Sequence, residues 1–333
     1  MKNITVLTSM LLLLNLSACK KNIEPKATIE EQPKKEETVA KTYAEISIKE
    51  GGHWEGRKYL EGTFKNMDSV KVPTEHTDHS WYIRYEGPGW ESNKIGYRLY
   101  LDWRNAIDIF GKKTDTMVLS KVGLDGFDSY HEMQNWGSDI LKAGKGLGIG
   151  AIGRYVNKEV VHFNEVDSTF AKTENFENQS VVTVNYFGWK TNNQKTNLTS
   201  NLSISPNERY TKHTIQSSEA LQGICTGIVK LSDLPLLQNE SENEKWGYVA
   251  TYGKQSLVPD NLGMAIFYKK ESISEITEGN YDHVLVFKPT TTAITFYFLG
   301  AWEQEINGIQ SQEEFLSYLD QKLAELNATD KLK

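Results

Sequence analysis

From about residue 43 onwards the chain is a series of short runs rich in β-branched and aromatic residues, separated by glycine, asparagine, aspartate or proline. Several runs alternate, as residues 182–186 (VTVNY) do, which is typical of a strand with one buried and one solvated face. Many such strands at roughly ten-residue spacing indicate antiparallel sheets packed as a sandwich. The predicted strands are 81–85, 97–103, 155–163, 181–189, 198–204, 210–216, 223–231, 247–252, 264–270, 283–287 and 294–298.

One segment near the C-terminus has helical periodicity instead. Ser311 and Glu314 have the spacing of a capping box, so we expect a helix over 311–326. Its apolar face carries Phe315, Leu319, Leu323 and Leu326. No internal repeat interrupts the chain, so we predict one all-β domain over 43–326, a large antiparallel β-sandwich with a C-terminal helix, and a tail over 327–333.

The N-terminus has the features of an export signal. Lys2 precedes an apolar stretch over 4–16 that is too short to span a membrane, and the small residues Ser17 and Ala18 precede Cys19. Residues 16–19 (LSAC) resemble a bacterial lipobox, in which the cysteine is acylated after removal of the signal. We therefore predict a lipoprotein signal peptide over 1–18 and a lipid on Cys19, which anchors the protein to the cell envelope, on the outer membrane. The alternative is a plain signal peptide with a chance cysteine.

The segment 19–42 contains six lysines, five glutamates and no aromatic residue. It offers too little apolar surface to offset its ordering entropy, so we expect a flexible tether. The remaining cysteine, Cys225, lies in an apolar run and is predicted to be a buried strand residue without a disulfide partner. The formal net charge is −7 and no basic stripe is present, which argues against a nucleic-acid partner.

Two apparent motifs do not fit their usual structural context. Residues 148–153 (GIGAIG) match the dinucleotide-binding pattern, but that pattern needs a preceding strand and a following helix, and residues 154–156 read as a strand. We interpret these glycines as sites of close backbone approach. Residues 75–79 (EHTDH) hold four possible metal ligands, and we favour a solvated loop over a metal site.

The densest group of polar and aromatic residues lies between 90 and 153. In a strand over 97–103, Arg98, Tyr100 and Asp102 would share one face, and Tyr97 would lie on the other. The polar face is either the floor of a site or a solvent face with a cross-strand ion pair. Trp90 and Trp136 lie beside charged residues rather than inside apolar runs, which suits an aromatic groove for sugars, although most tryptophans of a sandwich belong to its core.

An anionic substrate would need a local cationic patch, because the protein as a whole is acidic. Lysines in two later segments, Lys212 and Lys254, are candidates for it. The full set of candidate cations is Arg98, Arg104, Lys142, Lys145, Lys212 and Lys254.

Five segments carry a resemblance to a known family. They are 90–113 (WESNKIGYRLYLDWRNAIDIFGKK), 125–153 (DGFDSYHEMQNWGSDILKAGKGLGIGAIG), 225–230 (CTGIVK), 246–257 (WGYVATYGKQSL) and 260–271 (DNLGMAIFYKKE). The chain resembles Bacteroidota lipoproteins that are named only as a domain of unknown function and occur in polysaccharide-utilisation loci. A member from an ulvan-degrading locus removes water from a saturated uronic acid at the non-reducing end of oligosaccharides. The resemblance thus implies an oligosaccharide dehydratase that acts on an acidic substrate and requires no organic cofactor.

The chemistry of that reaction assigns roles to particular residues. Proton removal beside a carboxylate needs a cation on its oxygens, for which Arg98 or Arg104 is suited, with Lys254 as a substitute. His131 with Tyr130 offers a base and an acid in one loop, and Tyr97 is an alternate base. The predicted substrate-binding residues are Lys254, Trp90, Trp136, Asp102 and Lys212.

Two other functions remain open. A glycan-binding lipoprotein would use the same aromatics without chemistry. A glycoside hydrolase would use paired carboxylates such as Glu91 and Asp102. The sandwich is similar to the galactose-mutarotase-like supersandwich, but a shared fold does not establish an activity.

Overall fold

The computed structural model describes residues 41–125, 129–231, 233–239 and 243–333. The predicted signal peptide over 1–18, the lipid on Cys19 and the tether as far as residue 40 lie outside the described residues and stay predictions. Thr42, expected at the end of the tether, is the first residue of strand β1 (Thr42–Glu45). Within the described part of the chain, no helix has the length and apolar character needed to cross a membrane.

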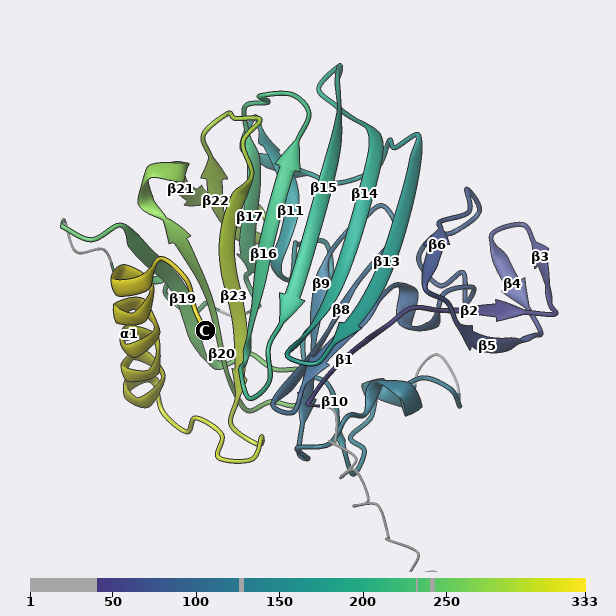
Figure 1. The fold of residues 1–333 in the computed structure, drawn as a ribbon, viewed down its shortest axis with the longest axis horizontal. Helices are drawn as coiled ribbons and strands as arrows, with labels where there is room; N and C mark the ends of the chain where they lie inside the picture. Colours follow the sequence, from purple (N-terminus) through teal and green to yellow (C-terminus); the bar gives the residue numbers. More distant parts are fainter. Residues whose placement is uncertain (1–40, 126–128, 232, 240–242) are drawn as a thin grey trace, which may run out of the picture. The chain divides into compact units, whose positions relative to one another are not determined.

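The largest sheet is antiparallel and has the strand order β18-β19-β20-β23-β16-β15-β14-β13-β6 (Figure 1). Its strands are β6 (Ser69–Lys71), β13 (Ser168–Phe176), β14 (Gln179–Thr191), β15 (Gln194–Ile204), β16 (Tyr210–Ser217), β18 (Leu237–Asn239), β19 (Trp246–Lys254), β20 (Asn261–Lys269) and β23 (Ile294–Trp302). The chain alternates between buried and exposed residues along β15, because one face of this half of the sheet is solvated.

Two five-stranded sheets have the orders β1-β7-β8-β9-β10 and β12-β11-β17-β22-β21. The first contains, besides β1, strands β7 (Gly89–Ser92), β8 (Ile95–Leu99), β9 (Ile107–Lys112) and β10 (Gly137–Asp139). The second contains β11 (Ile149–Val156), β12 (Glu159–Val161), β17 (Ile224–Val229), β21 (Ile273–Glu278) and β22 (Asp282–Phe287). The hairpins are β2 (Ser47–Glu50) with β5 (Thr63–Asn66) and β3 (His53–Glu55) with β4 (Lys58–Leu60). The 3₁₀ turns are η1 (Arg84–Glu86), η2 (Leu119–Lys121), η3 (Ser129–His131) and η4 (Lys270–Ser272).

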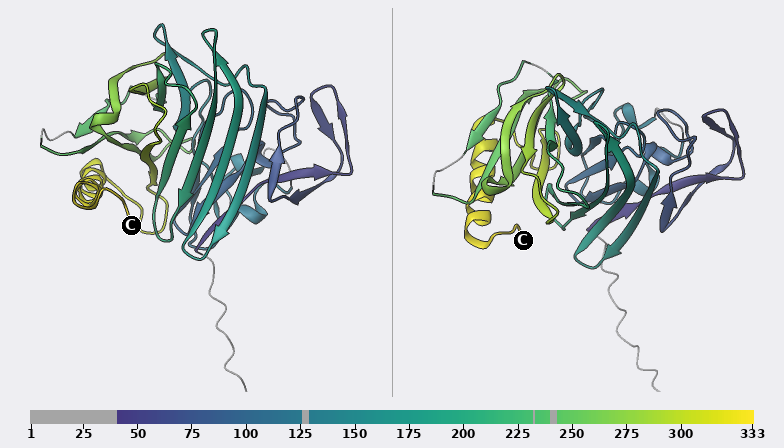
Figure 2. Two further views of the ribbon diagram at one scale, coloured as in Figure 1. Left: turned by 45° about the horizontal axis from the view of Figure 1, so that its top comes forward. Right: turned by 90° about the horizontal axis from the view of Figure 1, so that it is seen from above.

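Both five-stranded sheets pack against the largest sheet. Strands β1 and β7 contact β13, β14 and β15, whereas β11 and β17 contact β20 and β23. The layers are seen from above in Figure 2. Apolar side chains from all three sheets, such as Ile109, Val184 and Ile228, form one buried cluster between the layers. The predicted all-β sandwich is therefore confirmed.

The C-terminal helix, α1 (Gln312–Thr329), is also confirmed and covers β19 and β20 (Figures 1 and 2). Ser311 Oγ accepts a hydrogen bond from the Glu314 backbone N–H at 3.1 Å, as a capping box requires. The Glu314 side chain reaches back to the N–H of Gln310 rather than to that of Ser311. Strand β20 is a continuous apolar run because it is buried on both faces, with Ile266 toward the sandwich core and Phe267 toward the helix.

Three predicted strands differ from the observed ones. The strand expected over 97–103 ends at Leu99, and residues 81–85 lead into the 3₁₀ turn η1. The stretch 155–163 is a hairpin, because Asn157 and Lys158 both adopt left-handed φ angles and reverse the chain between β11 and β12.

The glycine motif at 148–153 lies almost wholly within β11, so the context of a dinucleotide site is absent there. Gly148 has a φ of 72°, and a Cβ atom at this position would lie 1.9 Å from the carbonyl oxygen of Ile107. Gly148 and Ile107 form an isolated bridge that joins the two five-stranded sheets. The interpretation of this glycine as a site of close backbone approach is thus confirmed.

We expect Gly148→Ala to lower the free energy of unfolding by about 3 kcal/mol, because it adds a backbone clash to the cost of a left-handed φ angle. Urea denaturation followed by circular dichroism measures the change. The matched control is Gly144→Ala, which has a φ of 59° but no atom within 4 Å of the added Cβ, and should cost only about 1–2 kcal/mol. Equal losses in the two variants would show that the close approach has no energetic role.

Candidate functional site

A pocket of about 480 Å³ lies over the sheet that contains β8, β9 and β10. It combines side chains from those strands with residues from loops elsewhere in the chain, such as His79 before β7 and Leu257 after β19. The lining residues are His79, Glu86, Arg98, Tyr100, Arg104, Asp108, His131, Asp139, Leu141, Lys142, Gly144 and Leu257. Formally, three cationic side chains face three carboxyl groups, and two histidines complete the titratable set.

Arg98 forms the centre of the pocket floor. It lies directly opposite Asp108 on the neighbouring strand, and its side chain is only 2% exposed. One nitrogen, Nη2, lies 2.6 Å from Asp139 Oδ2 and 3.0 Å from Asp108 Oδ2. The guanidinium also donates to the hydroxyl groups of Tyr100 and Tyr130, each at 2.9 Å. Arg98 is therefore fixed from several sides in one orientation.

Asp108, one of the carboxyl groups that contact this arginine, has a raised pKa. Burial, followed by the charge of Asp139, raises the pKa of Asp108 to about 6, although Arg98 opposes the shift. Burial alone would lower the pKa of Arg98, but the acidic groups around it raise it instead. The floor consequently keeps a permanent guanidinium charge beside a carboxyl group that takes up a proton in weakly acidic solution.

Arg104 is the second fixed cation. Its Nε lies 3.0 and 3.1 Å from the two oxygens of Asp102, and its Nη2 lies 3.0 Å from Asp78 and 3.1 Å from Glu86. The guanidinium stacks on the ring of Tyr100 at 4.0 Å from the centroid. Burial would lower the pKa of Arg104, but its bond to Asp102 raises it.

Lys142 is the third cation and differs from the two arginines. It follows β10 and is exposed at the pocket. Among the described residues, no carboxylate forms an ion pair with it. Its charge is therefore the one that an anionic ligand in the pocket can meet without competing with a protein carboxylate.

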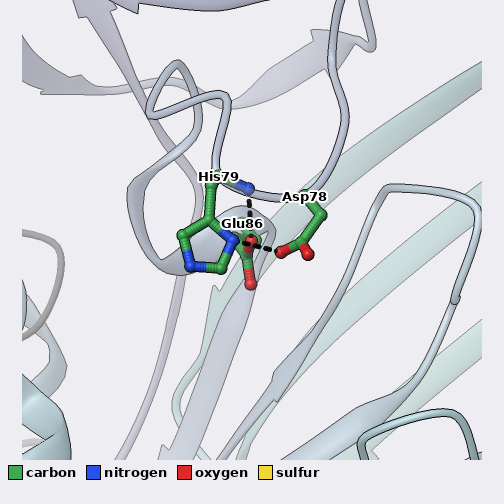
Figure 3. A group of neighbouring side chains, drawn as sticks. All are labelled: Asp78, His79 and Glu86. Carbon is green, nitrogen blue, oxygen red and sulfur yellow. Dashed lines mark hydrogen bonds and ion pairs between the residues drawn. The ribbon is translucent and has the colours of Figure 1, made fainter.

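Two histidines line the pocket, and each has a carboxylate at Nδ1. His131 Nδ1 lies 3.3 Å from Asp139 Oδ2, and His79 Nδ1 lies 2.6 Å from Asp78 Oδ1. Figure 3 shows the His79 imidazole with this nitrogen turned toward Asp78 and Nε2 on the other side of the ring. A carboxylate at Nδ1 sets the orientation and tautomer of an imidazole, which is how proteins prepare histidine for proton transfer.

The backbone beside His79 is constrained. His79, Tyr85 and Glu86 have φ angles of 55°, 39° and 71°, a left-handed conformation that non-glycine residues rarely adopt. The His79 N–H donates to Glu86 Oε1 at 3.0 Å, and Glu86 is buried (Figure 3). Such strain is concentrated at functional sites, where the surrounding structure compensates for it.

The loop at 75–79 contributes to a possible cation site. Asp78, His79 and Glu86 each offer one ligand atom, all within 4.8 Å of one another (Figure 3). However, the Arg104 guanidinium already contacts Asp78 and Glu86 at 3.0 and 3.1 Å. A metal ion here would have to displace that positive charge, so we do not propose one.

The structure brings together three of the predicted catalytic residues, Arg98, Arg104 and His131, in the pocket. Tyr130 does not line it, but its buried hydroxyl accepts a hydrogen bond from Arg98, and burial raises its pKa. Asp102, predicted to bind substrate, instead holds Arg104 from behind.

Other predicted residues lie away from the pocket. Tyr97 is in the core, where its hydroxyl donates to the Arg209 carbonyl at 2.5 Å and burial raises its pKa. Trp90 stacks on Tyr97 and donates to Thr211, and Trp136 packs edge-to-face on Phe110. The two lysines, Lys212 on β16 and Lys254 at the end of β19, are exposed and do not line the pocket.

Glu91, the first member of the predicted carboxylate pair, is also remote from the pocket lining. It is fully buried, forms an ion pair with Lys112 and accepts the N–H groups of Val118 and Leu119 at 2.8 Å. Glu91 thus orders the segment around η2, and it is not brought together with Asp102 in the pocket.

Sequence reasoning missed His79, Glu86, Asp108 and Asp139 as pocket residues. His79 was visible in the loop 75–79, which we interpreted as solvated. The two aspartates lie in short strands that the pattern did not predict, β9 and β10. The alternation of Arg98 and Tyr97 between two faces is confirmed, and it is the signal that locates the floor.

A family model matches residues 9–330, and its description is a domain of unknown function, DUF4861. The chain belongs to this family. The match spans nearly the whole chain, including every strand and residue of the pocket. No curated protein and no solved structure is matched by it. The similarity to the galactose-mutarotase-like supersandwich accordingly stays a prediction.

Proposed function

We propose that this DUF4861 protein is an oligosaccharide dehydratase, which eliminates water from a saturated uronic acid at the non-reducing end of ulvan-type oligosaccharides. The observation that carries the proposal is one pocket that combines a lysine without a carboxylate partner among the described residues, Lys142, with a histidine held by a carboxylate, His131. The sequence resemblance to lipoproteins of polysaccharide-utilisation loci supports the same substrate class.

Lys142 is proposed to bind the uronate carboxylate. When the proton leaves the adjacent carbon, a second negative charge develops on the carboxylate oxygens, and a cation near them lowers the barrier. Arg98 and Arg104 are already paired with protein carboxylates, so they shape the pocket and add positive potential rather than release their partners. We therefore assign the binding of the substrate carboxylate, which the sequence had suggested for Arg98 or Arg104, to Lys142.

His131 is proposed to be the base. Asp139 lies at its Nδ1, so the proton from carbon would go to Nε2, and the carboxylate would stabilise the imidazolium that forms. Arg98 holds Asp139 from the other side at 2.6 Å, which keeps the orienting carboxylate in place.

The alternative of a glycoside hydrolase finds less support in the pocket. Asp108 and Asp139 are two carboxyl groups of the pocket, but both contact the same nitrogen of Arg98. A guanidinium therefore occupies the place between them where a glycosidic bond would have to lie. A glycan-binding protein without activity remains the second candidate, because the pocket could hold the uronate without transforming it.

The direct test is to incubate the purified protein with oligosaccharides that end in a saturated uronate. A dehydratase produces a conjugated double bond, seen as ultraviolet absorbance, and a product lighter by one water. Binding without either change would identify a glycan-binding protein, and release of reducing sugar without absorbance would identify a hydrolase.

We expect Lys142→Met to raise the KM for the uronate substrate by about tenfold or more, because the charge that meets the carboxylate is lost. Initial rates of absorbance gain measure it. The matched control is Lys195→Met, since Lys195 is an exposed lysine paired with Asp167 outside the pocket. An unchanged KM in the Lys142 variant would assign carboxylate binding to another group.

The location of the activity is proposed from the N-terminal sequence. Lipid attachment to Cys19 would anchor the domain to the cell envelope, at the outer membrane, where acidic oligosaccharides arrive. Incorporation of a labelled fatty acid into the full chain, and its loss in Cys19→Ala, tests this location.

A further inference from the structure

We propose that His79, held by Asp78, is the acid that protonates the departing hydroxyl group. This inference rests on the dehydratase function and completes it, because elimination of water needs both a base and an acid. The sequence had paired His131 with Tyr130 for these two roles. The Tyr130 hydroxyl, however, is buried on Arg98 and does not line the pocket.

The position of His79 meets the geometric requirement. Its side chain lines the same pocket as His131 but comes from a different segment, the loop before η1. Asp78 Oδ1 contacts Nδ1, and Nε2 is on the opposite side of the ring (Figure 3). The two histidines thus supply two separate proton-transfer groups to one pocket.

Each of the two histidines is held by its own carboxylate. His79 Nδ1 lies 2.6 Å from Asp78 Oδ1, and the backbone N–H of His79 donates to Glu86, so one carboxylate holds the imidazole and another holds the backbone. His131 lies farther from its carboxylate, 3.3 Å, and that carboxylate is shared with Arg98 at 2.6 Å. Each imidazole is thus oriented by a carboxylate that an arginine also contacts, and because the two histidines come from separate segments, one can act as the acid while the other acts as the base.

Arg104 is a positioning residue for this acid. Its Nη2 contacts both Asp78 and Glu86, which are the two carboxylates that hold His79. Asp102 fixes the same guanidinium from the other side. His79 has a left-handed φ of 55°, and its side chain lines the pocket.

The step balances without an oxidant or cofactor. His131 takes the proton from the carbon beside the carboxylate, and the C–H electron pair becomes the new carbon–carbon double bond. The C–O bond at the next carbon breaks, and its electrons stay on oxygen, which takes a proton from His79 and leaves as water. Solvent then returns a proton to His79 and removes one from His131.

The test compares two leaving groups in His79→Gln. One substrate carries the natural hydroxyl, and the other carries fluoride at the same carbon, because fluoride departs with much less need for a proton. We expect His79→Gln to lower kcat/KM for the hydroxyl substrate by about 100-fold or more and for the fluoride substrate by less than about tenfold. His131→Ala should impair both substrates alike.

A second variant and a control keep the result interpretable. Asp78→Asn should show the same selective loss with a smaller amplitude, because the acid is misoriented rather than removed. His53→Gln is the matched control, since His53 is also an exposed histidine beside a carboxylate, Glu55, but lies outside the pocket lining.

Each outcome is decisive. Loss confined to the hydroxyl substrate supports the acid role of His79. Equal loss on both substrates, or retained activity on both, overturns it while leaving the dehydratase function intact. Inactivity of the unmodified protein on both substrates overturns the dehydratase function and the acid role together.

Discussion

His131→Ala is expected to lower kcat/KM for water elimination by about 10²–10⁴-fold, the contribution that a positioned general base makes. The imidazole is the group of the pocket that combines partial exposure, 37% of its side chain, with a buried carboxylate at Nδ1. Its removal leaves Lys142 in place, so the substrate should still bind. Absorbance assays of the variant give kcat/KM, and calorimetric titration at a temperature where turnover is negligible gives the dissociation constant.

The control for this prediction is His53→Ala, which removes an exposed histidine outside the pocket and should leave the rate unchanged. The folded state of both variants is checked by thermal unfolding. A His131 variant that stays folded and retains more than a tenth of the unmodified kcat/KM would contradict the role of base. Loss of affinity with an unchanged kcat would instead make His131 a binding residue.

Arg98→Met is expected to lower the free energy of unfolding by about 3–5 kcal/mol, because it leaves two buried carboxyl groups, Asp108 and Asp139, without their cation. Urea denaturation measures the loss. Arg98→Met combined with Asp108→Asn should recover part of it, since one of the uncompensated charges is then absent. A loss below about 1 kcal/mol in the single variant would show that the carboxyl groups find other partners.

The pH dependence of this loss has a defined sign. The pKa of Asp108 in the folded protein, about 6, is above the ordinary value of 3.8, so the folded state binds this proton more tightly than the unfolded state. The contribution of Asp108 to stability therefore falls as pH rises from about 4 through 6. Removal of Arg98 raises the pKa of Asp108 further, so the fall in stability extends to higher pH. Arg98→Met should therefore lose more stability at pH 8 than at pH 5.

Local patterns predicted the strands whose faces differ in burial. Residues 198–204 alternate between buried and exposed positions because β15 has one solvated face, and this alternation predicted the strand. The helix α1 was predicted because its cap and its apolar face are both local features. Short strands such as β9 and β10 were not predicted, because the pocket residues Asp108 and Asp139 interrupt their apolar pattern.

The pocket residues also fall into those that the local sequence could predict and those that it could not. Arg98 could be singled out from the sequence because strand alternation separates it from Tyr97 without knowledge of any partner. The environment of a side chain, by contrast, depends on groups far away in sequence. From the local pattern, Trp90, Lys254 and His131 were all candidate site residues. Packing against other segments places Trp90 in the core and leaves Lys254 outside the pocket lining.

The sequence by itself determined an all-β sandwich closed by a C-terminal helix, with Arg98 and His131 as candidates for chemistry. It determined these because period-two alternation, helix caps and residue chemistry are properties of neighbouring residues. Only the tertiary structure decided which carboxylate holds which histidine and which pocket cation has no carboxylate partner among the described residues. Folding brings Asp78, Glu86 and Arg104 together from separate segments, and it pairs both arginines with carboxylates but leaves Lys142 without such a partner among the described residues.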